Sequence, residues 1–108
     1  MGVTYTVQIT LKPGRAAEFL QLLGPVLDEM RHEATFVNAV VHRDPANPDR
    51  FLLYETWTDA RDVQQVQMGR AYRQAYWEGL PELLAAPREV ATWEPVRADF
   101  RAEAGAPA

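Results

Sequence analysis

One ten-residue stretch of this 108-residue chain, RFLLYETWTD at residues 50–59, restricts the possible folds most strongly. It is the densest run of strand-favouring residues in the sequence, and the Asp59 that closes it is a typical N-cap for a following helix. Because side chains alternate along a strand, Glu55 shares one face with three apolar side chains, and the other face is also mainly apolar. Both faces of this strand therefore need to be covered, and the lone carboxylate must be paired or have a raised pKa.

The remaining periodicities predict three more strands, one long helix and a pair of shorter helices. Alternation predicts strands at residues 3–11, 35–43 and 89–96, and helical spacing of apolar residues predicts helices at 15–32, from Asp59 to Gly69, and through 72–83. The order strand, helix, strand, strand, helix pair, strand is that of a split βαβ fold. This is a ferredoxin-like α+β domain whose four-stranded antiparallel sheet carries helices on one face. The length allows one such domain at residues 1–97, followed by a C-terminal tail at 98–108.

The two central strands are expected to form a hairpin. Residues 44–49 (DPANPD) are turn-forming, so the strands on either side of them should pair antiparallel. If Arg43 faces Arg50, then Phe36 lies opposite Trp57 and Asn38 lies opposite Glu55. Apolar side chains occupy both faces of this hairpin, whereas the helices cover only one. A second copy of the same sheet is the simplest cover for the other face, so we expect a homodimer.

Composition and charge argue against several classes of protein. A net charge of −4 without a basic cluster argues against a nucleic-acid partner. No apolar run approaches the roughly 18 residues of a membrane span, and the N-terminal residues show no secretory signal, so we expect a cytoplasmic protein without a membrane partner. There is no Cys, and the two His, His32 and His42, lie on different predicted elements without metal-ligand spacing. We therefore predict neither a disulfide nor a metal site.

Four segments carry a resemblance to a known family. They are residues 12–15 (KPGR) with Phe19 downstream, 41–45 (VHRDP), 47–57 (NPDRFLLYETW) and 80–84 (LPELL). Through them the chain resembles the antibiotic biosynthesis monooxygenase family of small dimeric α+β barrel proteins, over nearly all of residues 3–97. The resemblance implies oxygenation of an electron-rich phenol, anthrone or quinol by O₂ without metal, flavin or haem, because the aromatic substrate supplies the electrons.

The candidate catalytic residues follow from one departure from that family. Its members usually carry a His in the helix nine residues after the strand Trp, where this chain has Val66, or Gln67 if one residue is gapped. Neither side chain can act as a general base. The polar contact to a substrate must then come from Glu55, Tyr72 or Tyr76, the two Tyr sharing a predicted helical stripe.

Five further residues are candidates for substrate binding. They are Asn38, Trp57, Arg70, Trp77 and Trp93. The three Trp rings can stack on a flat ligand, Arg70 and its neighbour Arg73 can hold a phenolate, and the Asn is expected to lie beside the carboxylate of the central strand. Each also has an ordinary structural interpretation, as a core aromatic, a solvated charge or a hydrogen-bond partner within the hairpin.

The sequence favours a cofactor-independent, monooxygenase-like enzyme that uses O₂ on a small aromatic, quinol or polyketide-type substrate. We expect its pocket between the sheet and the helix pair, walled by residues 55–57 and 72–77. One alternative is a non-catalytic dimer that binds a hydrophobic metabolite. The other is an isomerase or cyclase on the same fold, which needs an acid–base pair such as Glu55 with a Tyr.

Overall fold

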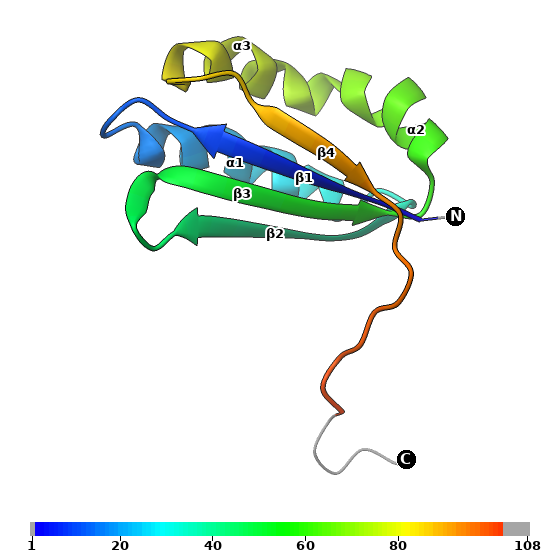
Figure 1. Ribbon diagram of the computed structural model, residues 1–108. Helices are drawn as coiled ribbons and strands as arrows, with labels where there is room; N and C mark the ends of the chain where they lie inside the picture. The colour runs from blue at the N-terminus through cyan, green and yellow to red at the C-terminus, as the bar shows by residue number, and fades with distance from the viewer. Residues whose placement is uncertain (1, 103–108) are drawn as a thin grey trace.

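The computed structural model describes residues 2–102 and contains all the predicted strands and helical regions (Figure 1). The elements are β1 (Val3–Thr10), α1 (Ala16–Met30), β2 (Phe36–Asp44), β3 (Asn47–Trp57), α2 (Ala60–Gln65), the 3₁₀ turns η1 (Gln67–Gly69) and η2 (Ala71–Arg73), α3 (Gln74–Leu83) and β4 (Glu89–Trp93). Part of the predicted tail, residues 103–108, lies outside the described residues. Within the described part of the chain, no helix is long and apolar enough to cross a membrane.

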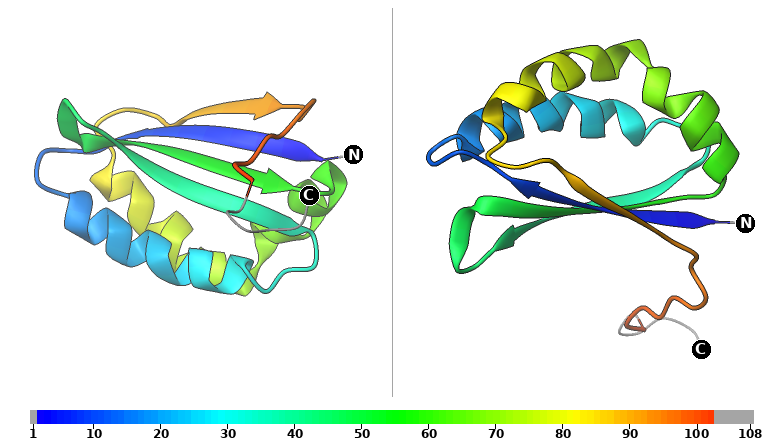
Figure 2. Two further views of the ribbon diagram at one scale, coloured as in Figure 1. Left: turned by 90° about the horizontal axis from the view of Figure 1, so that it is seen from below. Right: turned by 45° about the horizontal axis from the view of Figure 1, so that its top comes forward.

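The strands form one antiparallel sheet in the order β2-β3-β1-β4. All the helices lie on the same face of this sheet, with α1 and α3 packed beside each other (Figure 2). β3 lies between β1 and β2, so the crossover through α1 skips one position in the sheet. This is the split βαβ arrangement, and the prediction of a ferredoxin-like α+β fold is confirmed.

The core lies between the sheet and α1 with α3. Alternate residues of β1 and β3 face the helices, and α1 and α3 each turn an apolar stripe toward them. The buried residues of these surfaces include Val7, Ile9, Phe51, Leu53, Trp57, Phe19, Leu23, Val26, Met30, Leu80 and Leu83. At the centre the rings of Phe19 and Phe51 lie 5.1 Å apart. Each large apolar side chain buried in this way contributes roughly 1.5–3 kcal/mol to the free energy of folding. The apolar strand faces and the apolar helix stripes therefore stabilise the fold by packing together.

The predicted register of the central hairpin is right for Phe36 and Trp57 and wrong for the other predicted pairs. Phe36 faces Trp57 as expected, but the register shifts before Asn38, which pairs with Thr56 instead of Glu55. The cause is a β-bulge: Val37 is an extra residue on β2, and an extra residue exchanges the faces of every residue after it. Asn38 therefore lies on the face of the sheet that the helices leave uncovered.

The turn of the hairpin is also shorter than predicted. β3 begins at Asn47, so only two residues separate the strands in place of the expected six. The side chains of Asp44 and Asn47 accept hydrogen bonds from the backbone nitrogens of Ala46 (2.8 Å) and Asp49 (3.0 Å). Such short local bonds let polar residues form a tight turn, where composition alone indicated a longer loop.

The remaining boundaries differ by a few residues. Asp59 is the N-cap of α2 as predicted, with Oδ1 accepting from the backbone nitrogens of Arg61 (2.9 Å) and Asp62 (3.3 Å). The helix predicted through 72–83 begins only at Gln74, after the two 3₁₀ turns. β4 ends at Trp93, three residues earlier than expected, and residues 94–102 continue as an exposed extended segment on the uncovered side of the sheet (Figure 1).

Candidate functional site

A cavity of about 290 Å³ lies between the helices and the sheet. Its walls come from the sheet (Tyr5, Val7, Leu53, Glu55, Val90), from α1 (Leu23, Val26, Met30), from the segment α2 to α3 (Val63, Gln64, Met68, Arg73, Tyr76, Trp77) and from Arg88 before β4. Most of these side chains are apolar and a few are polar or charged. This composition, and a volume near the lower end of the roughly 300–1,000 Å³ range, is typical of small-molecule sites.

The sheet supplies a carboxylate and a phenol to the cavity floor. Glu55 is on the helix-facing side of β3, and Tyr5 is its direct partner on β1. The indole Nε1 of Trp57 donates a hydrogen bond of 3.1 Å to Glu55 Oε1, which fixes the carboxylate. The Tyr5 hydroxyl is buried and makes no hydrogen bond of good geometry with any described residue. Burial raises the pKa of Tyr5, the Gln64 side chain beside it lowers it, and Glu55 adds to the rise.

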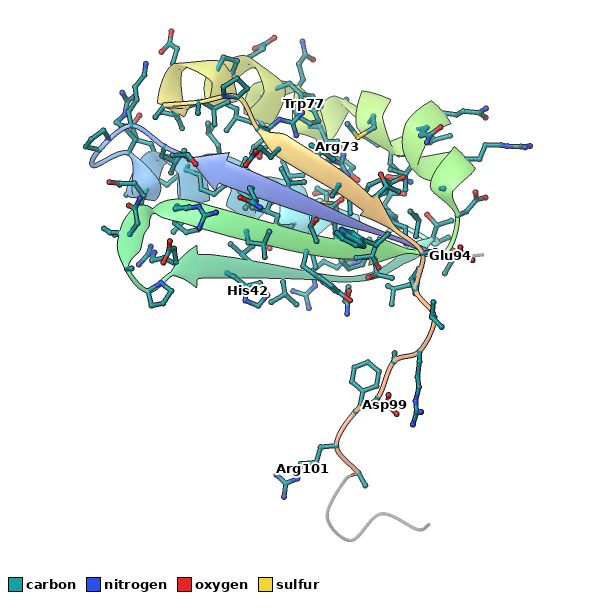
Figure 3. The ribbon with its side chains drawn as sticks, viewed as in Figure 1. His42, Arg73, Trp77, Glu94, Asp99 and Arg101 are labelled. Carbon is teal, nitrogen blue, oxygen red and sulfur yellow. The ribbon has the colours of Figure 1, made fainter. Side chains whose placement is uncertain are left out.

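The η2 turn and α3 supply the opposite wall. Arg73, Tyr76 and Leu80 follow one another at helical spacing, and all three are buried. The rings of Tyr76 and Trp77 meet edge to face at 5.3 Å, and the guanidinium of Arg88 lies 5.0 Å from the centre of the Trp77 ring. Figure 3 shows Arg73 and Trp77 close together on the helix-covered side of the sheet, while His42 lies on β2, away from them.

Tyr76 is held as a neutral phenol. Burial raises the pKa of Tyr76 to about 12, with the nearby Glu55 adding to the rise and the positive charges of Arg88 and Arg73 opposing it. At neutral pH the hydroxyl therefore keeps its proton and can donate a hydrogen bond to a ligand. The same influences show that one carboxylate and two guanidinium groups lie near this hydroxyl.

Arg73 has the least usual environment in the cavity wall. The residue is only 5% exposed, and its Nε and Nη2 atoms have no hydrogen-bond partner within residues 2–102. An arginine cannot escape burial by losing its proton, and an unpaired charge in such a place is unfavourable. Two nitrogens of this cation in the cavity wall are therefore without a partner among residues 2–102, although its charge lowers the pKa of the neighbouring Tyr72.

Tyr72 and Arg70 do not line the cavity. Both bind Glu33, which follows α1: the Tyr72 hydroxyl donates to Oε1 (3.1 Å), and Arg70 Nη2 donates to Oε2 (3.1 Å). The buried amide of Gln67 donates to Glu33 and to Asp62, at 3.1 Å each. We call these five residues the Glu33 network. It connects the end of α1 to α2 and the 3₁₀ turns, so in this structure Tyr72 and Arg70 act as structural residues.

The other predicted residues divide between core, cavity and open face. Trp57 is fully buried, packs edge to face on Phe36 at 5.2 Å and reaches the cavity only through its bond to Glu55. Asn38 lies across the sheet because of the bulge in β2. Trp93 also lies there, since it pairs with Thr4 and its Nε1 donates to Thr6 (2.9 Å). Of the predicted site residues, only Glu55, Tyr76 and Trp77 line the cavity.

Tyr5, Gln64 and Arg88 line the cavity but were not predicted as site residues, and Arg73 was considered only beside Arg70, as a partner for a phenolate or a solvated charge. For two of these four residues, the position in the sequence pattern already pointed toward the cavity. Tyr5 is on the apolar face of its strand, and Arg73 stands three residues before Tyr76, where the helical stripe calls for an apolar side chain. Arg88 comes from a loop, and its place in the cavity follows only from the docking of β4 against β1.

The Glu33 network predicts a pH dependence of stability. Hydrogen bonds from Gln67 and Tyr72 and the charge of Arg70 lower the pKa of Glu33 below its ordinary 4.5. The unfolded chain binds the proton more tightly, so this stabilisation is complete above pH 4.5 and is lost as the pH falls through the lower folded value. In urea unfolding from about pH 6 to pH 3, the wild type should lose more stability than Glu33→Gln. Parallel curves for the two proteins contradict this.

Together these features define a class: a small ferredoxin-like protein with a mostly apolar ligand cavity between its sheet and its helices. In the described residues, no group of three or more His, Cys, Asp or Glu is placed to hold a metal ion. The sequence model of the family described as antibiotic biosynthesis monooxygenase matches residues 2–76. The chain belongs to this family, as the sequence resemblance indicated.

Individual relatives agree with that assignment. A protein of Pestalotiopsis microspora named "Putative monooxygenase GME11364" is 30% identical over 90 residues, covering 82% of this chain and 75% of the relative. The structure of Rv0793 from Mycobacterium tuberculosis superposes with a TM-score of 0.82 at 17% identity, covering 93% of this chain and 100% of the other. A point mutant of SnoaB, a cofactor-independent oxygenase from Streptomyces nogalater, gives 0.75 at 16% identity, covering 90% and 95%. At these identities the two structures show the shared fold.

Proposed function

We propose that this protein is a cofactor-independent monooxygenase that uses O₂ to oxygenate a small aromatic substrate of the quinol or polyketide type. The observation that carries the proposal is the cavity, in which Glu55, Tyr76 and Arg73 converge on a space walled by apolar side chains. Membership of the monooxygenase family supports it, as does the fold shared with a cofactor-independent oxygenase.

The reaction balances without an external reductant. In an anthrone, the CH₂ group between the rings becomes C=O: one atom of O₂ forms the carbonyl and the other leaves as water. The two C–H bonds supply the electrons and the protons. The protein has to bind the substrate, assist loss of the first proton and stabilise the electron-rich anion that reacts with O₂.

The cavity residues fit these tasks. Glu55, fixed by the Trp57 indole, is the carboxylate placed to accept a proton. Tyr76, protonated because its pKa is about 12, donates a hydrogen bond to the oxygen on which negative charge develops. The guanidinium of Arg73 supplies a positive charge in the same cavity wall, which holds an anionic substrate. Because the walls are apolar, these interactions are stronger there than in water.

The direct test is O₂ consumption by the purified protein with a panel of quinols and anthrones, in the presence of a chelator and without added flavin. We expect at least one substrate to be oxidised faster than in buffer, with one O₂ consumed per product. If no member of the panel reacts faster than in buffer, the monooxygenase proposal is wrong.

One observation favours the alternative of a non-catalytic binding protein. At the position of the usual family His, Val66 is exposed and the amide of Gln67 is occupied by Glu33 and Asp62. Neither supplies a base to the cavity. Ligand binding without O₂ consumption would establish this alternative, whereas rearrangement of a bound ligand without O₂ uptake would indicate an isomerase or cyclase.

We also propose that the protein is a homodimer joined through the face of the sheet without helices, called the open face below. Its residues are Thr4, Thr6, Gln8, Asn38, Val40, His42, Leu52, Tyr54, Thr56, Ala91 and Trp93. Val40, Tyr54 and Trp93 are 41%, 38% and 55% exposed. Exposed aromatic and aliphatic side chains of this kind, set among polar ones, mark a protein contact, and a second copy of the chain carries the same side chains.

A further inference from the structure

The unpaired edge of the Arg73 guanidinium is the strongest sign of a ligand type. Nε and Nη2 lie on the same edge of the planar group, and both are buried without a partner among residues 2–102. Two parallel N–H groups on one edge match the two oxygens of a carboxylate. A single hydroxyl or phenolate oxygen can use this edge less well, because it leaves one of the two donors poorly satisfied.

The same chain shows this edge in use three residues earlier. Arg70 points its Nε and Nη2 at the two oxygens of Glu33, with distances of 3.1 Å each. Arg73 has no such carboxylate: the ion pairs found in the described part of the chain do not include it. The Arg70 side chain is 43% exposed and paired, whereas Arg73 is buried and two of its nitrogens have no partner, which is the reverse of what stability alone favours.

The charges around the cavity also call for an anion. Its walls carry two guanidinium groups, Arg73 and Arg88, and one carboxylate, Glu55. Arg88 lies over the Trp77 ring and Arg73 lines the same cavity, so an anionic ligand there meets two cations. These three groups carry a net charge of about +1, so a ligand with one negative charge makes the site close to neutral.

We propose that the cavity binds an aromatic carboxylate as a monoanion. Its two oxygens pair with Nε and Nη2 of Arg73, and its rings lie against Trp77 and the apolar walls. This deepens the proposed function, since it narrows the substrate to aromatic acids, and its identification as a substrate site rests on that function. Binding itself does not depend on turnover.

The first test compares two probes of the same shape, 2-naphthoate and the neutral 2-naphthamide, by titration calorimetry. We expect naphthoate to bind the wild type at least roughly tenfold more tightly than naphthamide, because charge-assisted hydrogen bonds are the stronger ones.

Three variants show whether Arg73 is the cause. Arg73→Gln should weaken naphthoate binding roughly 10- to 100-fold and leave naphthamide binding nearly unchanged. Arg73→Lys keeps the positive charge but not the two parallel N–H groups. Its affinity for naphthoate should therefore lie between those of the wild type and Arg73→Gln. Arg61→Gln, an exposed arginine outside the cavity, is the matched control and should bind like the wild type.

The second test separates ligand binding from a structural role. Without ligand, Arg73→Met should raise the melting temperature, because it replaces an unpaired buried charge by an unbranched apolar side chain. Naphthoate should raise the melting temperature of the wild type and not that of Arg73→Met. A structural arginine gives the opposite result, a lower melting temperature without ligand.

Four outcomes overturn the proposal: equal affinity of the wild type for the two probes, unchanged naphthoate binding by a folded Arg73 variant, no binding of either probe at millimolar concentration, or a lower melting temperature of ligand-free Arg73→Met. The measurement is independent of the O₂ assay. Selective naphthoate binding without O₂ consumption contradicts the monooxygenase function alone, whereas O₂ consumption with neutral quinols and no preference for the acid contradicts this inference alone.

Discussion

Tyr76→Phe should lower the turnover of an O₂-consuming substrate by roughly ten- to a thousandfold, the range found when one hydrogen bond to a developing anion is removed. The substitution keeps the ring, its contact with Trp77 and its place in the core, and removes only the hydroxyl. Glu55→Gln should cause a decrease of similar size, since the amide keeps the shape and cannot accept the proton. The effect should appear mainly in kcat, because both groups act on charge that develops during the reaction.

Tyr72→Phe is the matched control, because it removes a hydroxyl from the same segment but outside the cavity. Its hydroxyl binds Glu33, so its loss should reduce stability by about 1 kcal/mol and leave kcat unchanged. Initial rates of O₂ uptake, with urea unfolding of each variant, distinguish the two effects. If Tyr76→Phe and Glu55→Gln both keep the full rate, these residues do not have the roles assigned to them. If Tyr72→Phe loses activity without loss of stability, the Glu33 network is not only structural.

The wild-type protein should be a dimer of about twice 12.2 kDa at micromolar concentration, and Val40→Glu should convert it to a monomer. Stable interfaces bury roughly 1,200–2,000 Å² in total, and the open face presents Val40 of the edge strand β2 beside Tyr54 of β3. A carboxylate there loses its water in the dimer without gaining a partner, which opposes association strongly. In a β-strand at a solvated surface the same change is mild.

Val66→Glu is the control for this experiment, because Val66 is 40% exposed and Val40 is 41% exposed. Val66 lies on the helical side of the molecule, away from the open face, so its variant should remain a dimer. Light scattering gives the mass, and circular dichroism shows that each variant is folded. A monomeric wild type with the fold intact, or a Val40→Glu variant that stays dimeric, contradicts the proposed interface.

The fold follows from features that are local in the sequence. Alternation along residues 3–11 and 50–57, the helical stripe around Phe19 and the N-cap at Asp59 each depend on neighbours within one or two turns. The order of elements then leaves few ways to cover the apolar faces, and the split βαβ arrangement is the simplest. For the same reason Glu55 was recognisable: a carboxylate on an apolar strand face stands out without any knowledge of its neighbours.

The tertiary structure decided the register and the membership of the site. Pairing with β3 places Val37 in a bulge and so moves Asn38 to the open face, a result of contacts between strands. Tyr72 and Tyr76 share a stripe in an ideal helix of 3.6 residues per turn. The 3₁₀ turn before Gln74 has about three residues per turn, which rotates Tyr72 toward Glu33 and away from the cavity.

The meeting of Arg73 with Arg88, Tyr76 and Glu55 also belongs to the tertiary level, because these residues come from a turn, a loop, a helix and a strand. A sequence shows which residues carry charge. Whether a charge is paired depends on which segments pack together, and those contacts are long-range. The sequence therefore determined the sheet, the helices and the apolar surfaces between them. The packing of those surfaces decided which polar side chains face the cavity, and left two nitrogens of Arg73 there without a partner among residues 2–102.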